Sequence, residues 1–136
     1  MDIRMTPIHP FLQEAIDAHV AIERWFSGAE SADGLASLLQ RFSPCFTMIT
    51  PQGATLDHAG VEHLFARGHG ARPGLRIAID ELHGLGTWPD GAVVTYREIQ
   101  VDGQGRRTVR RSTAVFHRDA DGRVAWRHLH ETYVAD

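Results

Sequence analysis

The chain has 136 residues and a mass of 15.1 kDa, which is enough for one domain and too little for two well-buried ones. Hydrophobic residues make up 43% and charged residues 23%, values near the globular average that exclude a disordered chain or a fibrous repeat. The formal net charge of −3 argues against a nucleic-acid binder, which usually carries a basic surplus or stripe. We expect one domain over residues 1–136, with its core between residues 10 and 134.

The ends and the single cysteine suggest where the protein works. The first residues lack the apolar core of a signal peptide, and no segment reaches the roughly 18 apolar residues of a membrane span. Cys45 cannot form an intrachain disulfide, and its β-rich surroundings predict a half-buried structural thiol. We therefore expect a cytoplasmic protein without a membrane partner.

The first half of the chain predicts three helices. Apolar residues recur every three or four positions over residues 10–26, as on one stripe of an amphipathic helix, and Gly28 suits its end. A second, shorter helix capped by Ser31 or Asp33 ends before Pro44. Asp57 can cap a third helix that ends at the glycines around residues 68–70.

The β-rich segments follow a different order. One strand, residues 45–50, lies between the second and third helices and is closed by a Pro-Gln-Gly turn. Four more segments, joined by short glycine-bearing loops, follow the third helix: 75–85, 92–101, 108–117 and 124–134. Helices first and a long meander afterwards predict an α+β protein in which a curved antiparallel sheet wraps the helices.

Two stretches carry a resemblance to a known family. The first, residues 38–53, reads LLQRFSPCFTMITPQG; the second combines STAVFHRD at residues 112–119 with Gly122-Arg123 and WRHLH at residues 126–130. Their order resembles the nuclear transport factor 2-like superfamily, in its SnoaL-like branch and the calcium/calmodulin-dependent kinase association domains. The resemblance implies a cone-shaped α+β roll, with three N-terminal helices packed in a strongly curved antiparallel sheet around a pocket.

Alternation along the strands leaves two faces open as the pocket wall. On the last strand, one face carries Trp126, His128, His130 and Thr132, and the other carries Arg127, Leu129, Glu131 and Tyr133. The resemblance favours the second face, because association domains hold an arginine where this chain has Arg97. The same comparison implies that these residues face the pocket: Arg110, Ser112, Leu129, Glu131 and Tyr133.

The first functional hypothesis is a binding domain without demonstrated chemistry. Arg97, together with Arg110, would receive a small carboxylate or enolate, while Tyr133 and Ser112 add hydrogen bonds. Trp25 or Phe26 would line the ligand pocket. In the alternative interpretation, Arg97 pairs with Glu98 or Glu131 on a solvated strand.

The second hypothesis is an enzyme resembling SnoaL-like cyclases, ketosteroid isomerases or dehydratases, which acts on a proton next to a carbonyl. Glu131 or His19 would be the base, and Tyr133 or Arg97 would stabilise the oxyanion. The favoured alternative for His19 is a core histidine bonded to the backbone, because isolated inward histidines are usually structural. A raised carboxyl pKa at Glu131 would favour catalysis, and a salt-bridged Glu131 with a lowered pKa would favour binding.

Other chemistries find little support. His128 and His130 have the spacing of a metal-binding pair, but no spacing defines a third ligand, so we predict neither a metal nor another cofactor. Serine-hydrolase, phosphate-loop and dinucleotide motifs do not occur. We expect a small organic acid as partner and a homodimer, because Val115 and Trp126 would otherwise leave an apolar outer face in water. A pure oligomerisation module is the third possibility.

Overall fold

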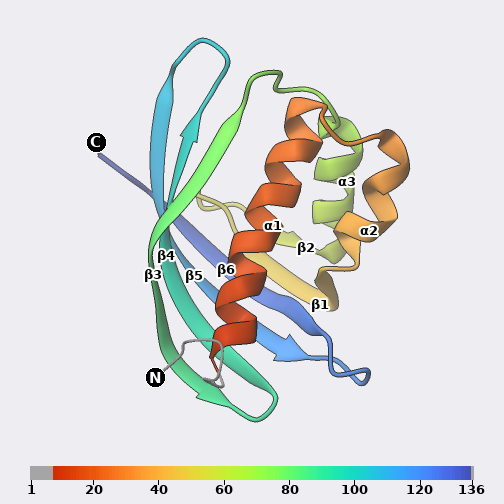
Figure 1. Ribbon diagram of the computed structural model, residues 1–136, viewed down its shortest axis with the longest axis vertical. Coiled ribbons are helices and arrows are strands. Elements are labelled where there is room, and N and C mark those ends of the chain that lie inside the picture. Colours follow the sequence, from red (N-terminus) through yellow and green to blue (C-terminus); the bar gives the residue numbers. More distant parts are fainter. Residues whose placement is uncertain (1–7, 136) are drawn as a thin grey trace.

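The computed structural model describes residues 8–135. Its elements are, in order, α1 (His9–Ser27), the 3₁₀ helix η2 (Ala32–Gly34), α2 (Leu35–Leu39), β1 (Phe42–Ile49), β2 (Thr55–Asp57), α3 (His58–Gly68), β3 (Arg76–Trp88), β4 (Gly91–Val101), β5 (Arg107–Arg118) and β6 (Val124–Val134). The helices lie on one side of a bent sheet (Figure 1), which confirms the predicted α+β roll. Within the described range, no helix combines the length and the apolar character needed to span a bilayer.

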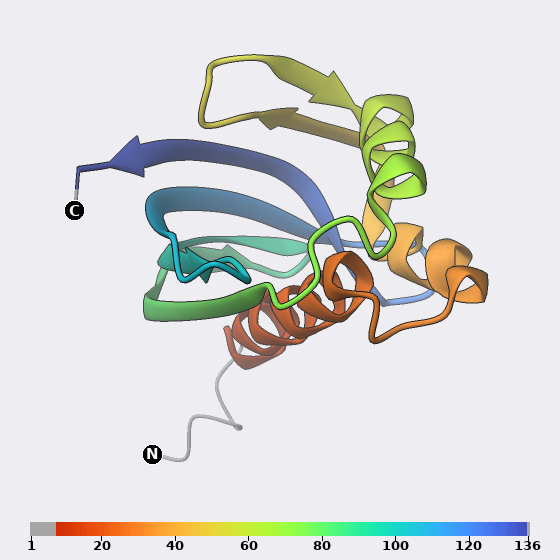
Figure 2. The same ribbon diagram turned by 90° about the horizontal axis from the view of Figure 1, so that it is seen from above.

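The six strands form one sheet in the order β2-β1-β6-β5-β4-β3. Seen from above, it curls from β3 beside α1 to the β1–β2 hairpin beside α3 (Figure 2). Every neighbouring pair is antiparallel except β1 and β6, which are parallel. The sheet is therefore mixed and not purely antiparallel as expected. No hairpin joins β1 to β6, so turn geometry does not impose an antiparallel direction on them.

The predicted helix ends are mostly correct. Gly28 ends α1 with a φ of 87°, a left-handed conformation that glycine adopts without strain, and its amide bonds to the Trp25 carbonyl. The Asp57 side chain accepts a hydrogen bond from the Gly60 amide at 2.9 Å and so caps α3. Sequence reasoning missed β2, which has only three residues and runs straight into this cap. Cys45 is exposed, not half-buried.

The core contains Trp126, which the sequence analysis placed on the outer face. Val115 pairs with His128, whereas Phe116 pairs with Trp126, so Arg127 is one extra residue in β6. This β-bulge breaks the strict alternation and turns both Trp126 and Leu129 inward. The Trp126 indole is 2% exposed and donates a hydrogen bond to Glu14 at 3.0 Å. The prediction for Trp126 was wrong because a bulge leaves no reliable signature in a single sequence.

Candidate functional site

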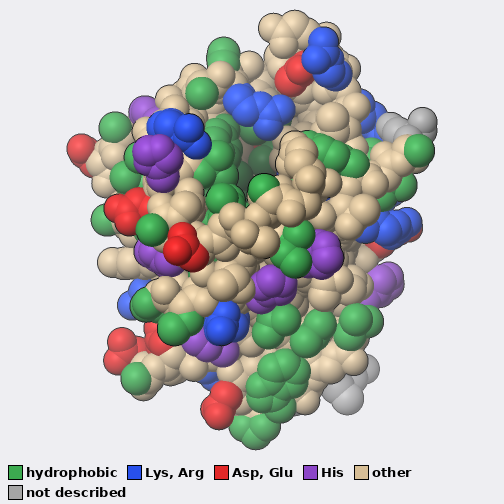
Figure 3. Space-filling model, turned by 180° about the vertical axis from the view of Figure 1, so that it is seen from behind, with side chains coloured by type: hydrophobic (Ala, Val, Ile, Leu, Met, Phe, Trp, Pro, Cys, Tyr) green, Lys and Arg blue, Asp and Glu red, His purple; other side chains and the backbone are tan. Residues whose placement is uncertain are grey.

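A cavity of about 130 Å³ lies between the helices and the concave face of the sheet. Figure 3 shows the molecule hollowed on the side opposite to Figure 1, with hydrophobic side chains inside the hollow. The cavity walls from α1, β1 and α3 are mostly apolar: Ile22, Phe26, Phe42, Phe46, Met48, Val61, Leu64 and Phe65. Its polar part comes from His19 on α1 and from four strand residues: Glu98, Gln100, Arg110 and Glu131.

Register explains why the polar residues meet. Glu98 lies opposite Arg110 on β4 and β5, and Ser112 lies opposite Glu131 on β5 and β6. Partners across neighbouring strands point to the same face, and this face is the concave one because Glu98, Ser112 and Glu131 are all buried. The structure thus places Arg110, Leu129 and Glu131 in the cavity wall and Ser112 beside Glu131.

Arg97 does not enter the cavity. It lies between buried Tyr96 and buried Glu98 and points to the convex face. There its Nε and Nη2 donate to the two carboxylate oxygens of Asp80 at 2.8 and 2.6 Å. The inward orientation predicted for Arg97 was wrong, and so was its predicted pairing with Glu98 or Glu131. Side chains along a strand alternate between the two faces of the sheet, so an error of one position in the predicted register places a side chain on the wrong face.

Trp25 is also absent from this cavity. Its indole is 2% exposed and donates a hydrogen bond to the Phe65 carbonyl at 2.9 Å, and its ring packs 4.5 Å from that of His69. Successive helix residues point about 100° apart, so Phe26 lines the cavity while Trp25 anchors α1 to α3. Of the two aromatic residues that the sequence suggested, the structure selects Phe26.

Tyr133 lies at the end of β6 and is 44% exposed. Its hydroxyl accepts a hydrogen bond from Gln52 at 3.4 Å, and the Arg110 guanidinium lies 5.2 Å from its ring centre. The tyrosine therefore contacts Arg110 through its ring, and its hydroxyl does not line the cavity. This position does not support the predicted role of Tyr133 as a catalytic donor.

His19 and Glu98 form a buried ion pair. The His19 Nδ1 lies 2.6 Å from the Ala15 carbonyl oxygen, which can only accept, and Nε2 lies 3.1 Å from Glu98 Oε1. Burial lowers the pKa of His19, but the hydrogen bond and the charge of Glu98 outweigh it and raise that pKa. Burial likewise raises the pKa of Glu98, yet His19 and then Arg110 bring it well below its usual range. Both imidazole nitrogens are occupied, so His19 is not available as the base.

The ion pair continues into a chain of hydrogen bonds that the sequence analysis did not single out. Glu98 Oε2 accepts from the Gln100 amide at 2.6 Å, and Gln100 Oε1 accepts from Arg72 at 2.8 Å. Glu98 and Gln100 alternate with half-buried positions and share their face with apolar residues of β4. This shared face could have identified Glu98 as a site residue from the sequence, because a carboxylate on a buried apolar face needs a partner.

Arg110 and Glu131 form the second polar pair. The Arg110 Nη1 lies 3.2 Å from Glu131 Oε1, and the Ser112 hydroxyl lies 3.5 Å from Oε2. Burial, followed by the charge of Glu98, raises the pKa of Glu131 to about 7 despite the opposing charge of Arg110. The Arg110 Nε is buried and has no hydrogen-bond acceptor among residues 8–135. The polar end of the cavity thus holds a carboxyl that titrates near neutrality and an unsatisfied donor.

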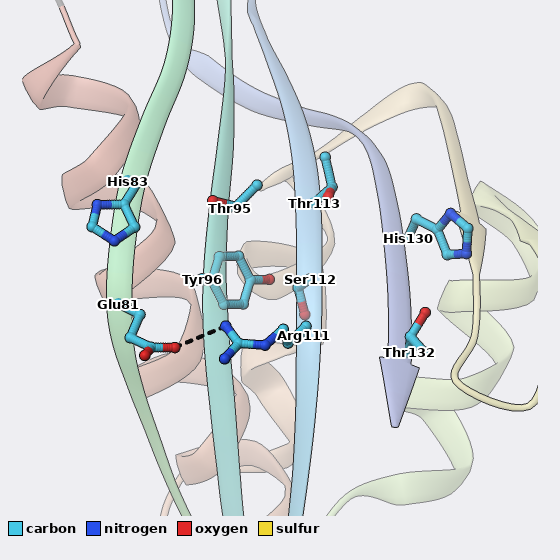
Figure 4. Close-up of a pocket in the computed structure, with 9 residues that line it drawn as sticks. All are labelled: Glu81, His83, Thr95, Tyr96, Arg111, Ser112, Thr113, His130 and Thr132. Atoms are coloured by element: carbon cyan, nitrogen blue, oxygen red, sulfur yellow. Dashed lines mark hydrogen bonds and ion pairs between the residues drawn. The ribbon is translucent and has the colours of Figure 1, made fainter. Parts of the chain in front are cut away.

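A second depression, about 570 Å³, lies on the convex face and is open to solvent. Figure 4 shows its side chains, with Thr95 and Thr113 on adjacent strands and the Arg111–Glu81 ion pair beside them. Arg111 has 59% of its side chain exposed. No three histidine, cysteine or acidic residues in the described part of the chain lie close enough together to hold a metal ion. We favour the concave cavity, because ionisable groups with perturbed pKa values gather there.

Known structures share this architecture. A crystal structure of an NTF2-like (nuclear transport factor 2-like) protein of unknown function from Pseudomonas aeruginosa is 47% identical to the chain, covers 93% of it and 99% of its own length, and has a TM-score of 0.88. The chain belongs to the NTF2-like family. Because the sequence identity covers nearly the whole length, the two proteins are similar in sequence as well as in fold.

More distant structures share the fold alone. A protein from Thiobacillus denitrificans, provisionally named a calcium/calmodulin-dependent protein kinase type II association domain, is 20% identical with a TM-score of 0.68 and covers 89% of this chain and 93% of its own. An NTF2-like protein from Cytophaga hutchinsonii is 16% identical with a TM-score of 0.76 and covers 96% and 100%. No family model matches the chain, and no curated protein matches it either. The narrower SnoaL-like assignment stays a prediction.

Proposed function

We propose that this NTF2-like protein binds a small organic acid in the concave cavity, with the ligand carboxylate at Arg110. The observation that carries the proposal is the buried Arg110 Nε, a charged donor without an acceptor. An unsatisfied buried donor is costly, and charge-assisted bonds to a carboxylate are the strongest means of satisfying a guanidinium. The Glu131 carboxyl occupies only the Nη1 side of Arg110.

The rest of the cavity defines the size and apolar character of the remainder of the ligand. The walls carry the aromatic rings of Phe26, Phe42 and Phe65, and the volume is about 130 Å³. An apolar cavity of about 150 Å³ can accommodate a benzene ring. A carboxylate on a compact apolar or aromatic body therefore matches both ends of the site. A module that only oligomerises would need no buried charged groups, so ligand binding is the better explanation of them.

Benzoate and its neutral analogue benzamide test this proposal. Benzoate at about 100 times its dissociation constant should stabilise the protein by about 2.7 kcal/mol, visible as a higher melting temperature, and benzamide should stabilise it less. Arg110→Met should abolish the benzoate effect. Arg111→Met is the matched control, because the neighbouring side chain points to the convex face, and it should keep the effect. Equal benzoate stabilisation of the Arg110→Met variant would contradict the proposal.

A specific observation supports proton abstraction next to a carbonyl as a second candidate function. Glu131 faces the cavity and its pKa is about 7, near the value at which a general base works best in neutral solution. Arg110 could stabilise the oxyanion that forms. A structure provisionally named a dehydratase of the NTF2-like family, from Streptomyces avermitilis, is 17% identical, and one provisionally named a ketosteroid isomerase, from Parabacteroides distasonis, is 10% identical.

Deuterium exchange distinguishes this second function from simple binding. In deuterated buffer at pH 7, the native protein should accelerate the exchange of protons next to the carbonyl of small cyclic ketones such as cyclohexanone, as followed by proton NMR. Glu131→Gln should reduce the acceleration at least a hundredfold, since general-base catalysis contributes about 10² to 10⁴. Exchange that is equally fast with the native protein and with Glu131→Gln would remove Glu131 as the base.

The assembly and location of the protein also remain proposals. A homodimer would cover apolar side chains that the described chain leaves exposed, among them Leu85 at 65% and Trp88 at 45%. The cytoplasmic location rests on the sequence argument alone.

A further inference from the structure

Without a ligand, the ionisable groups of the cavity form two ion pairs. His19 and Glu98 form one pair, and Arg110 and Glu131 form the other. With all four groups ionised, two positive and two negative charges cancel. An acid that enters as its anion therefore adds an uncompensated negative charge to a largely buried site, which is unfavourable in a medium of low dielectric constant.

The first pair cannot compensate for this charge. The two His19 nitrogens are occupied by the Ala15 carbonyl and Glu98, and Glu98 has one oxygen on His19 and the other on Gln100. Protonating Glu98 would break its ion pair with His19. The His19–Glu98 pair is therefore closed to both the ligand and an additional proton.

The second pair, Arg110 and Glu131, can still accept a ligand and a proton. Glu131 holds Arg110 at 3.2 Å and the Ser112 hydroxyl at only 3.5 Å, so neither contact is short. A ligand carboxylate at Arg110 would share one guanidinium with Glu131. Two carboxylates that share such a site do not both stay ionised, because their repulsion raises one pKa strongly.

We propose that the cavity takes up one proton together with each organic anion, and that Glu131 receives this proton and donates a hydrogen bond to the ligand carboxylate. The inference rests on the proposed binding function and adds the chemical form of the complex: a carboxylic acid of the protein against a carboxylate of the ligand, with Arg110 beside both. No bond other than those to the transferred proton changes, and the proton comes from solvent.

All titratable and charged groups that face Glu131 enter this balance. They are His19 from α1, Tyr96 and Glu98 from β4, and Arg110 from β5. Burial raises the pKa of Tyr96 well above its usual range, so it stays neutral. The cavity residues from β1 and α3 are apolar. Glu131 is the one member of this set whose charge can change near neutral pH without breaking the His19–Glu98 pair.

Calorimetric titration with benzoate tests the proposal, in two buffers of different ionisation enthalpy, at pH 6 and at pH 8. At pH 8, the native protein should take up close to one proton per benzoate, and at pH 6 it should take up little. With a pKa of about 7 for Glu131, only about one molecule in eleven carries a protonated Glu131 at pH 8 and can bind the anion. The dissociation constant of benzoate should therefore be about tenfold higher at pH 8 than at pH 6. This measurement needs no variant.

The Glu131→Gln variant identifies the proton acceptor. Its amide imitates the protonated carboxyl, so it should bind benzoate at pH 8 about tenfold more tightly than the native protein, without proton uptake and with no change between pH 6 and pH 8. Proton uptake that persists in this variant would place the proton on a group other than Glu131 and overturn the inference. Native binding without proton uptake at pH 8 would overturn it and leave the binding function intact. Failure of benzoate and other small aromatic acids to bind at either pH would overturn the proposed function and this inference with it.

Discussion

Glu98→Ala is expected to lower the free energy of unfolding by about 3–5 kcal/mol at pH 6, because it leaves the buried charge of His19 without its partner. The side chains of His19 and Glu98 are only 7% and 5% exposed, so water cannot replace the lost carboxylate. Urea denaturation measures the change. Gln100, which donates to the same carboxylate, also loses its acceptor.

Asp80→Ala is the matched control for Glu98→Ala. Asp80 also pairs with a basic side chain, Arg97, at 2.6 Å, but on the exposed convex face. Ion pairs in solvent contribute little to stability, so this variant should lose far less than Glu98→Ala. Equal losses of unfolding free energy in the two variants would show that burial does not determine how much the His19–Glu98 pair contributes to stability.

The same pair predicts a pH window. The pKa of His19 is raised above its ordinary value of 6.5, so its contribution is complete below pH 6.5 and is lost as the pH rises through the higher folded-state pKa. The pKa of Glu98 is lowered from 4.5, so its contribution is complete above pH 4.5 and is lost as the pH falls. The ion pair therefore stabilises the fold most between these two values.

Glu131→Gln is expected to gain stability relative to the native protein as the pH rises. The folded-state pKa of Glu131 is about 7, against an ordinary value of 4.5. Below pH 4.5 the carboxyl is protonated in both states; between pH 4.5 and 7 only the unfolded chain ionises, so the native fold loses stability as the pH rises. Above pH 7 this cost is complete and on the order of 3 kcal/mol. Glutamine does not ionise and escapes it.

A series of urea denaturations from pH 4 to pH 8 measures this effect. The difference in unfolding free energy between Glu131→Gln and the native protein should grow across the interval and level off near its upper end. A difference that stays constant with pH would mean that Glu131 titrates normally in the fold.

The state of Glu131 does not separate binding from catalysis in the way the sequence analysis expected. A salt bridge was expected to go with a lowered pKa and binding, and burial with a raised pKa and catalysis. In the structure Glu131 has both the Arg110 salt bridge and a raised pKa. Burial and the nearby Glu98 charge are the stronger influences. The carboxyl is therefore suited to exchange a proton. The experiments with benzoate and with cyclic ketones distinguish proton uptake on ligand binding from proton transfer in catalysis.

The order of elements could be predicted from the sequence because its causes are local. The apolar stripe of α1, the Asp57 cap, the Gly28 terminus and the glycine-bearing turns each act within a few residues. Together they lead to helices first and a meander afterwards, and hence to the curved α+β roll. The closing-strand residues Leu129 and Glu131 were also placed on the correct face, through the family resemblance.

The composition of the cavity depends on contacts between distant parts of the chain. His19 meets Glu98 across 79 positions, and β1 lies parallel to β6 without a hairpin between them. A single step along β4 separates Arg97 on the outside from Glu98 inside, and one extra residue at Arg127 turns Trp126 into the core. Strand faces repeat every two residues, so small changes in register exchange inside and outside. Burial, which raises the pKa of Glu131, exists only once the sheet has closed over the helices.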